Sequence, residues 1–145
     1  MSARAQLDAF IDRFSPEVAN DARRALAFLA ARLPTATRLV YDNYNALVVG
    51  FAPNDRASQA ILSIALYPKY VRIFFLRGVD LPDPHGLLEG AGSQVRSIKL
   101  KPISRIETPE LGSLIDFAVA GVLSSSGKGA LVIKSISAKQ RPRRP

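Results

Sequence analysis

The spacing of apolar residues changes after residue 33, and this change constrains the fold more than any other feature of the sequence. Before it, apolar side chains recur every three or four residues, as on one face of a helix. The two stripes are Leu7, Phe10, Ile11 and Phe14, then Val18, Ala22, Leu26, Leu29 and Leu33. Ser15 and Pro16 between them are residue types that cap and open a helix. The spacing therefore predicts two consecutive helices, the second ending at Pro34.

From residue 38 onward the apolar residues come in short runs typical of strands. These runs span residues 39–41, 46–51, 61–67, 71–76 and 95–101. Turn-forming residues separate the first two runs and also the third and fourth, which predicts two hairpins. A third helix opens at Thr108 and Pro109, and residues 130–136 form a final strand rich in β-branched side chains. We expect an α+β fold with a largely antiparallel sheet of five to six strands and helices packed on one face.

Composition excludes several classes of protein. The chain has 145 residues, 48% of them hydrophobic, with no Cys and a single His. This rules out disulfide scaffolds, thiol nucleophiles and cysteine-ligated metals. We find no signal peptide and no apolar stretch that could span a membrane, so we expect a cytoplasmic protein that does not use a membrane.

Two neighbouring segments carry a family resemblance. Residues 81–92 read LPDPHGLLEGAG and residues 95–100 read VRSIKL. They resemble the YdhG-like family, bacterial domains of largely unknown function with a DP-x-x-LLEG-x-G segment before an R-H-I-K-L strand. The order of helices and strands is similar too. The resemblance implies a single YdhG-like α+β domain over residues 1–137, and we expect the polar, Pro-rich residues 138–145 to be a basic disordered tail.

The resemblance also brings in metal binding, because some YdhG-like proteins are discussed as frataxin-like iron chaperones. Iron carriage needs a carboxylate-rich surface. Residues 1–33 instead hold five basic and four acidic side chains, and Ser97 stands where the family motif has His. Weak candidate ligands are Asp80, Asp83, His85 and Glu89. We favour a different role for Asp83, as the cap of a short helix that Pro84 opens and Gly90 ends.

Catalysis finds little support in the sequence. No Gly-x-Ser-x-Gly elbow is present, and any hydroxyl–His–acid combination would have to use His85. Gly127-Lys128-Gly129 lacks the spacing and the hydroxyl residue of a phosphate loop. We therefore expect no enzyme, no cofactor and no resident metal.

All four tyrosines of the chain lie in or beside the two predicted hairpin turns. Tyr offers a flat face and a hydroxyl, and Asn offers both a donor and an acceptor. If the turns lie at the same end of the sheet, they could line a small polar-aromatic pocket. The candidate ligand-binding residues are Tyr41, Asn43, Tyr44, Asn45, Tyr67, Lys69 and Tyr70. The alternative is that they serve only as hairpin residues at the edge of the sheet.

The net charge of +8 invites a nucleic-acid interpretation. The basic residues that could contact phosphates are Arg96, Lys99, Lys101 and Arg105 along the fifth predicted strand, and Lys139, Arg141, Arg143 and Arg144 in the tail. Half of the excess charge belongs to that tail, and no sequence motif for nucleic-acid recognition accompanies it.

Three functions stay open. The first is a non-enzymatic module that binds a small ligand or a protein through the hairpin turns. The second is sequence-nonspecific nucleic-acid binding through the basic strand and tail, and the third is metal carriage, which the charge pattern disfavours.

Overall fold

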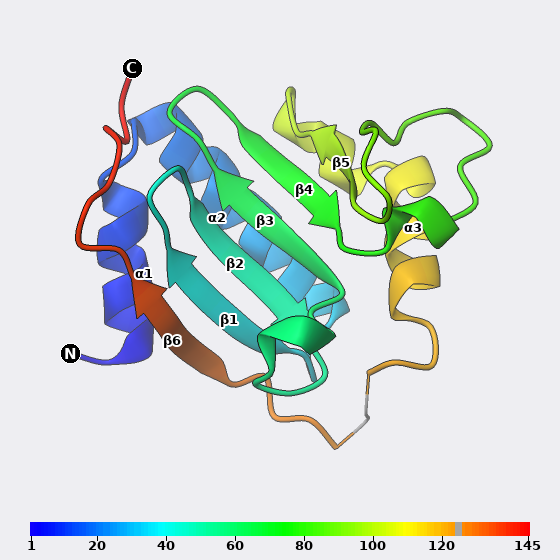
Figure 1. Cartoon of the computed structure of the whole chain (residues 1–145), viewed down its shortest axis with the longest axis horizontal. Coiled ribbons are helices and arrows are strands. Elements are labelled where there is room, and N and C mark those ends of the chain that lie inside the picture. Colours follow the sequence, from blue (N-terminus) through cyan, green and yellow to red (C-terminus); the bar gives the residue numbers. More distant parts are fainter. Residues whose placement is uncertain (124–125) are drawn as a thin grey trace.

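Helices and strands follow one another along the chain in the order that the sequence predicts (Figure 1). The structure is a computed structural model and describes residues 1–123 and 126–145. The helices are α1 (Ala3–Asp12), α2 (Pro16–Arg32) and α3 (Pro109–Val119), and the 3₁₀ turns are η1 (Ala57–Gln59), η2 (Gly78–Asp80) and η3 (Ile103–Glu107). The strands are β1 (Thr37–Asp42), β2 (Leu47–Ala52), β3 (Leu62–Leu66), β4 (Val71–Phe75), β5 (Arg96–Lys99) and β6 (Leu131–Ile136).

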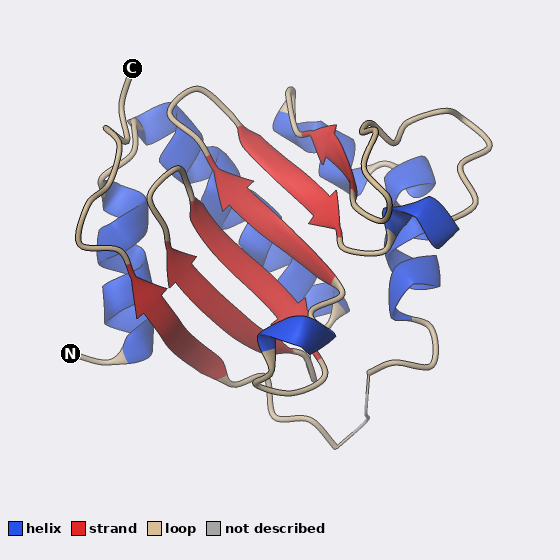
Figure 2. Cartoon of the chain, in the orientation of Figure 1, coloured by secondary structure: helices blue, strands red, loops and turns tan. Residues whose placement is uncertain are grey.

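The strands form a six-stranded sheet in the order β5-β4-β3-β2-β1-β6 (Figure 2). Neighbours from β1 to β5 are antiparallel, and β6 runs parallel to β1 at the opposite edge from β5. One row of paired positions is apolar on every strand: Ile133, Val40, Val49, Ile64, Ile73 and Ile98. Because successive residues point to opposite faces, this row marks the core face of the sheet. The α+β class and the largely antiparallel sheet are confirmed.

The core lies between this face and the apolar stripes of the helices. Leu29 and Ala22 of α2 are fully buried, together with Phe14 in the link from α1 to α2. In Figure 1, α2 lies behind the sheet and α1 lies alongside it, next to β6. The Ser15 hydroxyl accepts a hydrogen bond from the Val18 amide, so it caps α2 as predicted. The short turn η1 lies on the other face of the sheet, where Ala60 approaches Gly50.

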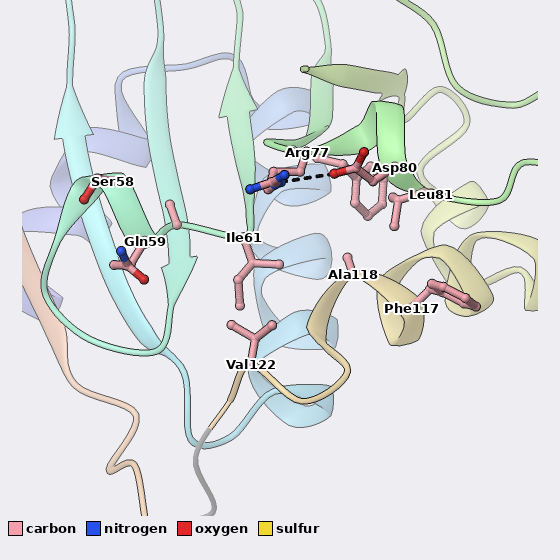
Figure 3. A pocket seen from close by; sticks show the side chains of 11 residues that line it. Ser58, Gln59, Ile61, Arg77, Asp80, Leu81, Phe117, Ala118 and Val122 are labelled. Atoms are coloured by element: carbon pink, nitrogen blue, oxygen red, sulfur yellow. Dashed lines mark hydrogen bonds and ion pairs between the residues drawn. The ribbon is translucent and has the colours of Figure 1, made fainter. Parts of the chain in front are cut away.

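Helix α3 is tied to α2 by charged side chains at the surface. Arg32 donates two hydrogen bonds to the Asp116 carboxylate, at 3.0 and 2.9 Å. Beyond α3, an open depression separates this helix from η1 and η2 (Figure 3). Within the described residues, no helix has the length and apolar character needed to cross a bilayer.

The segment before β5 departs from the expected short helix. Residues 83–90 form turns and an isolated bridge between Glu89 and Ser97, with positive φ angles at Gly86 and Gly90. Asp83 still caps backbone groups, because its carboxylate accepts hydrogen bonds from the amides of Leu87 and Leu88 at 2.9 Å each. The prediction found the capping residue but assigned the wrong conformation to what it caps.

The glycines after α3 serve packing. A Cβ on Gly127 would lie 2.2 Å from the Thr35 carbonyl oxygen, and one on Gly129 would lie 2.7 Å from the Pro34 carbonyl oxygen. The chain therefore passes too close to residues 34–35 for a side chain at either position. Residues 124 and 125, which precede these glycines, lie outside the described ranges.

Candidate functional site

Both tyrosine-bearing turns lie at the same end of the sheet. Strands β1 and β3 run in the same direction, and each ends in a turn that leads into its antiparallel neighbour. The turn at residues 43–46 is closed by the Asn43 amide donating to the Ala46 carbonyl, and the turn at 67–70 by the Tyr67 amide donating to the Tyr70 carbonyl. The shared end, which the pocket prediction required, therefore exists.

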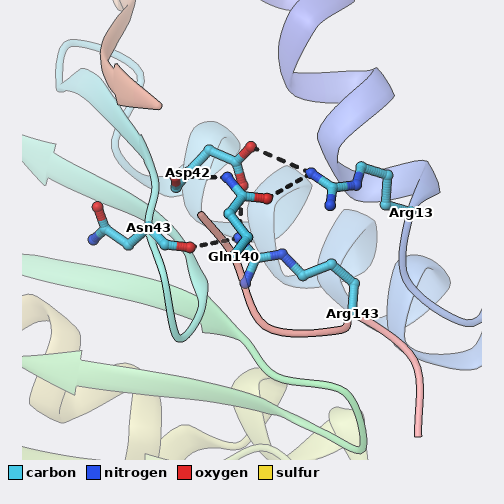
Figure 4. Close-up of polar contacts among 5 residues, drawn as sticks. All are labelled: Arg13, Asp42, Asn43, Gln140 and Arg143. Carbon is cyan, nitrogen blue, oxygen red and sulfur yellow. Dashed lines mark hydrogen bonds and ion pairs between the residues drawn. The ribbon is translucent and has the colours of Figure 1, made fainter. Parts of the chain in front are cut away.

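A third segment, which the sequence did not connect with these turns, joins them there. Residues 138–145 were expected to be disordered, but the structure gives them specific contacts with the first turn (Figure 4). The Gln140 side-chain amide donates to the Asp42 carbonyl at 2.9 Å, and the Arg141 amide donates to the Tyr44 carbonyl at 2.9 Å. We call residues 138–145 the C-terminal segment. The expectation of a disordered tail is wrong for the part that makes these contacts.

The C-terminal segment is anchored by a buried ion pair. The Arg143 guanidinium lies 2.8 Å from the Asp42 carboxylate, and the two residues are only 4% and 1% exposed. Arg143 also donates to the Asn43 carbonyl and lies over the Phe14 ring, 5.5 Å from its centroid. A buried carboxylate without a cation would be costly. The pair therefore explains why a polar segment packs against the fold.

The turns and the C-terminal segment together line an open groove of about 730 Å³. Its lining residues are Asn45, Tyr67, Pro68, Lys69, Arg141, Pro142, Arg144 and Pro145. Three of them carry positive side chains, and no acidic side chain lines the groove among the residues that the structure describes. We call this the C-terminal groove. Its charge and its size, within the usual range of about 300–1,000 Å³ for ligand pockets, suit an anionic small molecule.

Aromatic rings and cations continue from the groove across this end of the sheet. Tyr67 and Tyr70 lie with their ring centroids 5.0 Å apart, and the Lys99 ammonium lies 4.6 Å from the Tyr70 centroid. On the other side, the Arg141 guanidinium lies 6.0 Å from the ring centroid of Tyr44. Burial raises the pKa of the Tyr67 phenol, and the neighbouring Tyr70 raises it further. The Tyr67 hydroxyl is therefore a neutral hydrogen-bonding group at physiological pH.

The structure assigns different positions to the seven predicted turn residues. Asn45, Tyr67 and Lys69 line the groove. Tyr44 and Tyr70 lie beside it through their contacts with cations, and Asn43 contributes its backbone carbonyl to Arg143.

Tyr41 does not belong to the groove. It lies within β1, and its hydroxyl is buried without a hydrogen-bond partner among the described residues. Burial also raises the pKa of this phenol.

The predicted phosphate-contacting residues divide in the same way. Arg141 and Arg144 line the groove, Lys99 lies over Tyr70, and Lys101 and Lys139 are exposed. Several of the basic residues also bond within the fold. Arg144 donates to the carbonyls of Arg13 and Asp12, at 3.2 and 3.4 Å. Arg96 donates to the carbonyls of Gly92 and Val95, and Arg105 donates to the Lys99 carbonyl. Arg143 is buried as the anchor, so the predicted set does not form one free basic surface.

The weak metal candidates do not converge on one site. Asp80 pairs with Arg77 at 3.1 Å, and Glu89 pairs with Arg72 at 3.1 Å. Asp83 is used as a backbone cap, and His85 is exposed. No group of three or more potential ligands assembles in the part of the chain that the structure describes.

A signal for the C-terminal segment was present in the sequence. Asp42 is two residues after Val40 in the same strand, so both point to the core face, where an acidic side chain requires a cation. The arginine that meets this need is Arg143, separated from Asp42 by 101 positions. The spacing of local motifs cannot detect such a pair.

Comparison with known proteins gives no information on function, so function has to be inferred from the groove residues described above. No family model, no curated protein and no solved structure matches this chain. The resemblance to the YdhG-like family stays a prediction.

Proposed function

We propose that this protein is a non-enzymatic binding module that holds a small anionic ligand in the C-terminal groove. The observation that carries the proposal is the meeting of Lys69, Arg141 and Arg144 beside Tyr67 in a groove without acidic side chains. The proposal includes the cytoplasmic location expected from the sequence, and it does not depend on the YdhG-like resemblance.

The chemistry of the lining favours a ligand with a phosphate or carboxylate group attached to a flat organic part. Arginine offers a planar fork of donors that matches such groups, and lysine adds a mobile point charge. The Tyr67 ring and hydroxyl supply an apolar face with a polar end. The Arg141 amide donates to the Tyr44 carbonyl, and the Arg144 side chain donates to the carbonyls of Arg13 and Asp12. Together with the buried Arg143 between them, these bonds position both arginines before a ligand binds. Such preorganisation lowers the entropic cost of binding.

Titration with adenosine monophosphate, followed by amide chemical shifts, tests this function. The expected result is a saturable shift at Asn45, Tyr67 and Lys69. Lys69→Ala should weaken binding about tenfold, because one cation is lost from the groove. Lys69 is exposed, so the change should leave the fold intact.

Lys139→Ala is the matched control, since Lys139 is exposed in the same C-terminal segment but does not line the groove. Its affinity should equal that of the unaltered protein. Equal weakening by both changes would overturn the proposal, because only a diffuse charge effect would then remain. The absence of saturable shifts would overturn it as well.

A second candidate function is the binding of single-stranded nucleic acid, favoured by the Tyr70 and Lys99 contact beyond the groove. Proteins that bind single-stranded nucleic acid present aromatic rings on which the bases stack, next to cationic side chains that pair with the phosphates. Under this function an eight-nucleotide oligothymidylate should bind more tightly than adenosine monophosphate and lose affinity steeply with salt. Lys99→Ala should weaken only the oligonucleotide. If it weakens neither, the small-ligand function alone stands.

A further inference from the structure

A second concavity lies at the opposite end of the sheet from the C-terminal groove. It lies where β4 leads into η2 and where β3 begins after η1, and α3 closes its third side (Figure 3). Its volume is about 450 Å³, again within the range typical of small-molecule sites. We call it the α3 pocket. No residue lining the groove also lines this pocket.

Apolar side chains line the central part of the α3 pocket. Ile61 and Val122 face each other across it, and Ala118 and Leu81 lie further along (Figure 3). Phe75, whose side chain belongs to the hydrophobic core, also lines it. Phe75 is only 1% exposed, so the floor of the pocket lies against the closed core.

Large apolar side chains are exposed around this pocket. Phe117 is 61% exposed and Val122 is 44% exposed, and both line it. Val79, in the adjoining turn η2, is 47% exposed. Single exposed apolar residues need no explanation, but a group of them around a concavity marks a binding site.

The polar groups of the pocket are balanced in charge. Arg77 and Asp80 form an ion pair at 3.1 Å on its rim, and both side chains are well exposed. Ser58 and Gln59 add neutral donors and acceptors on the other side. An anion near Arg77 would meet Asp80, and a cation near Asp80 would meet Arg77. The rim therefore favours an uncharged polar group that can both donate and accept a hydrogen bond.

We propose that the α3 pocket binds a small, uncharged molecule with one aromatic or branched apolar part and one hydrogen-bonding group. The apolar part would lie between Ile61, Val122 and Ala118, and the polar group would meet the rim at Arg77 or Gln59. This site is separate from the proposed anion site and takes a ligand of opposite character.

Indole and phenol are suitable probes, because each combines a flat ring with one polar group. Titration into the full chain, followed by amide chemical shifts, should give saturable changes at Ala60, Ile61, Leu81 and Ala118. For ligands of this size we expect a dissociation constant of about 1 mM. Ala118→Leu places three more carbons in the pocket and should weaken binding at least about tenfold.

Val122→Ser and Val95→Ser form a matched pair of variants. Both remove an exposed valine, 44% and 39% accessible, but only Val122 lines the pocket. Val122→Ser should weaken the binding of indole, and Val95→Ser should leave it unchanged. The shifts should also persist in Lys69→Ala, whose altered residue lies in the groove, so failure of the anion site would not be confused with failure of this one.

Three outcomes would overturn the proposal. The first is the lack of saturable shifts with either probe up to about 10 mM, the weakest binding that suits a specific site. The second is retention of full affinity in Ala118→Leu with the fold intact by its amide spectrum. The third is concentration-dependent dimerisation in sedimentation that Val122→Ser abolishes, because the pocket would then be an interface between copies of the chain.

Discussion

Single residues at the boundary of the core decide where charge is tolerated in this protein. Asp42 occupies a core-facing strand position and is stabilised by Arg143 at 2.8 Å and by Arg13 at 3.6 Å. The cost of burying such a carboxylate is several kcal/mol, and close cations offset it. The position thus selects which other residues must be present around it.

The charges around Asp21 do not offset the cost of burying its carboxylate, and this predicts how the stability of the protein depends on pH. Burial raises its pKa above the ordinary 3.8, Glu17 raises it further, and Arg24 and Lys101 only partly counter this. The charged form is therefore less favourable in the folded protein than in the unfolded chain. Asp21→Asn should raise the free energy of unfolding at pH 7, by about 0.5 kcal/mol or less for a site near the surface.

The sign of this effect fixes its pH window. With a raised folded-state pKa, the protonated carboxyl favours folding below pH 3.8, and this contribution is lost as pH rises through the folded-state pKa. The gain from Asp21→Asn should therefore vanish in urea unfolding at about pH 3. Asp55→Asn, at an exposed loop residue, serves as the control. A gain that is the same at both pH values would contradict the explanation.

At the scale of elements, the C-terminal segment behaves as part of the fold because one arginine anchors it. Arg143→Met should lower the free energy of unfolding by about 2 kcal/mol, since Asp42 would keep only the more distant Arg13. Lys139→Met should change it by less than about 0.5 kcal/mol, because Lys139 is exposed. Urea unfolding followed by circular dichroism measures both.

A double replacement separates the loss of the ion pair from the loss of packing. Asp42→Leu combined with Arg143→Met replaces the buried charges with apolar groups, which is often neutral or stabilising. The double variant should be more stable than Arg143→Met alone. If the effects of Asp42→Leu and Arg143→Met on the free energy of unfolding simply add, the two side chains are not coupled, and the ion pair does not anchor the C-terminal segment.

The elements that sequence reasoning predicted are those fixed by neighbouring residues. The stripe of α2 and its Ser15 cap lie within a few positions of each other, and so do the residues that close each hairpin. Strand β6 was expected, but its place beside β1 depends on the pairing of Val40 with Ile133, which no local pattern encodes. The same applies to the groove, whose two walls come from opposite halves of the sequence.

Local rules also misjudged segments rich in Pro and Gly. Asp83 and Pro84 have the composition of a helix start, but residues 83–90 use the same groups to stabilise a loop. The C-terminal segment has the composition of a disordered tail, yet Asp42 supplies the contact that orders Arg143. Composition describes what a segment does alone, and a distant partner changes the outcome.

At the scale of the whole molecule, two concavities of different chemical character lie at opposite ends of one sheet. The groove gathers cations and tyrosines, and the α3 pocket gathers exposed apolar side chains. The strands between them are continuously paired and largely buried. Coupling between two sites requires an element whose equilibrium both sites bias, and we expect none in such a sheet.

We therefore predict that the two sites bind independently. The dissociation constant of adenosine monophosphate should be the same, within about twofold, with and without saturating indole. Any coupling between the two sites must be reciprocal, so the effect of adenosine monophosphate on indole binding should be equally small. Calorimetric titrations in both orders measure this. A change of about tenfold or more in either order would show that the sheet transmits a structural change.

The position of β6 has a consequence for how the molecule opens. This strand forms an edge of the sheet beside β1, and the C-terminal segment that follows it supplies one wall of the groove. Gln140, the Arg141 amide and Arg143 also hold the C-terminal segment to Asp42 and to the turn at residues 43–46. Arg141 and Arg144 would therefore leave the groove only when β6 and these contacts open together, and that opening would release a bound anion. A ligand in the groove would then stabilise this edge of the sheet against local unfolding. The rate of that local unfolding would in turn set an upper limit on the residence time of the ligand.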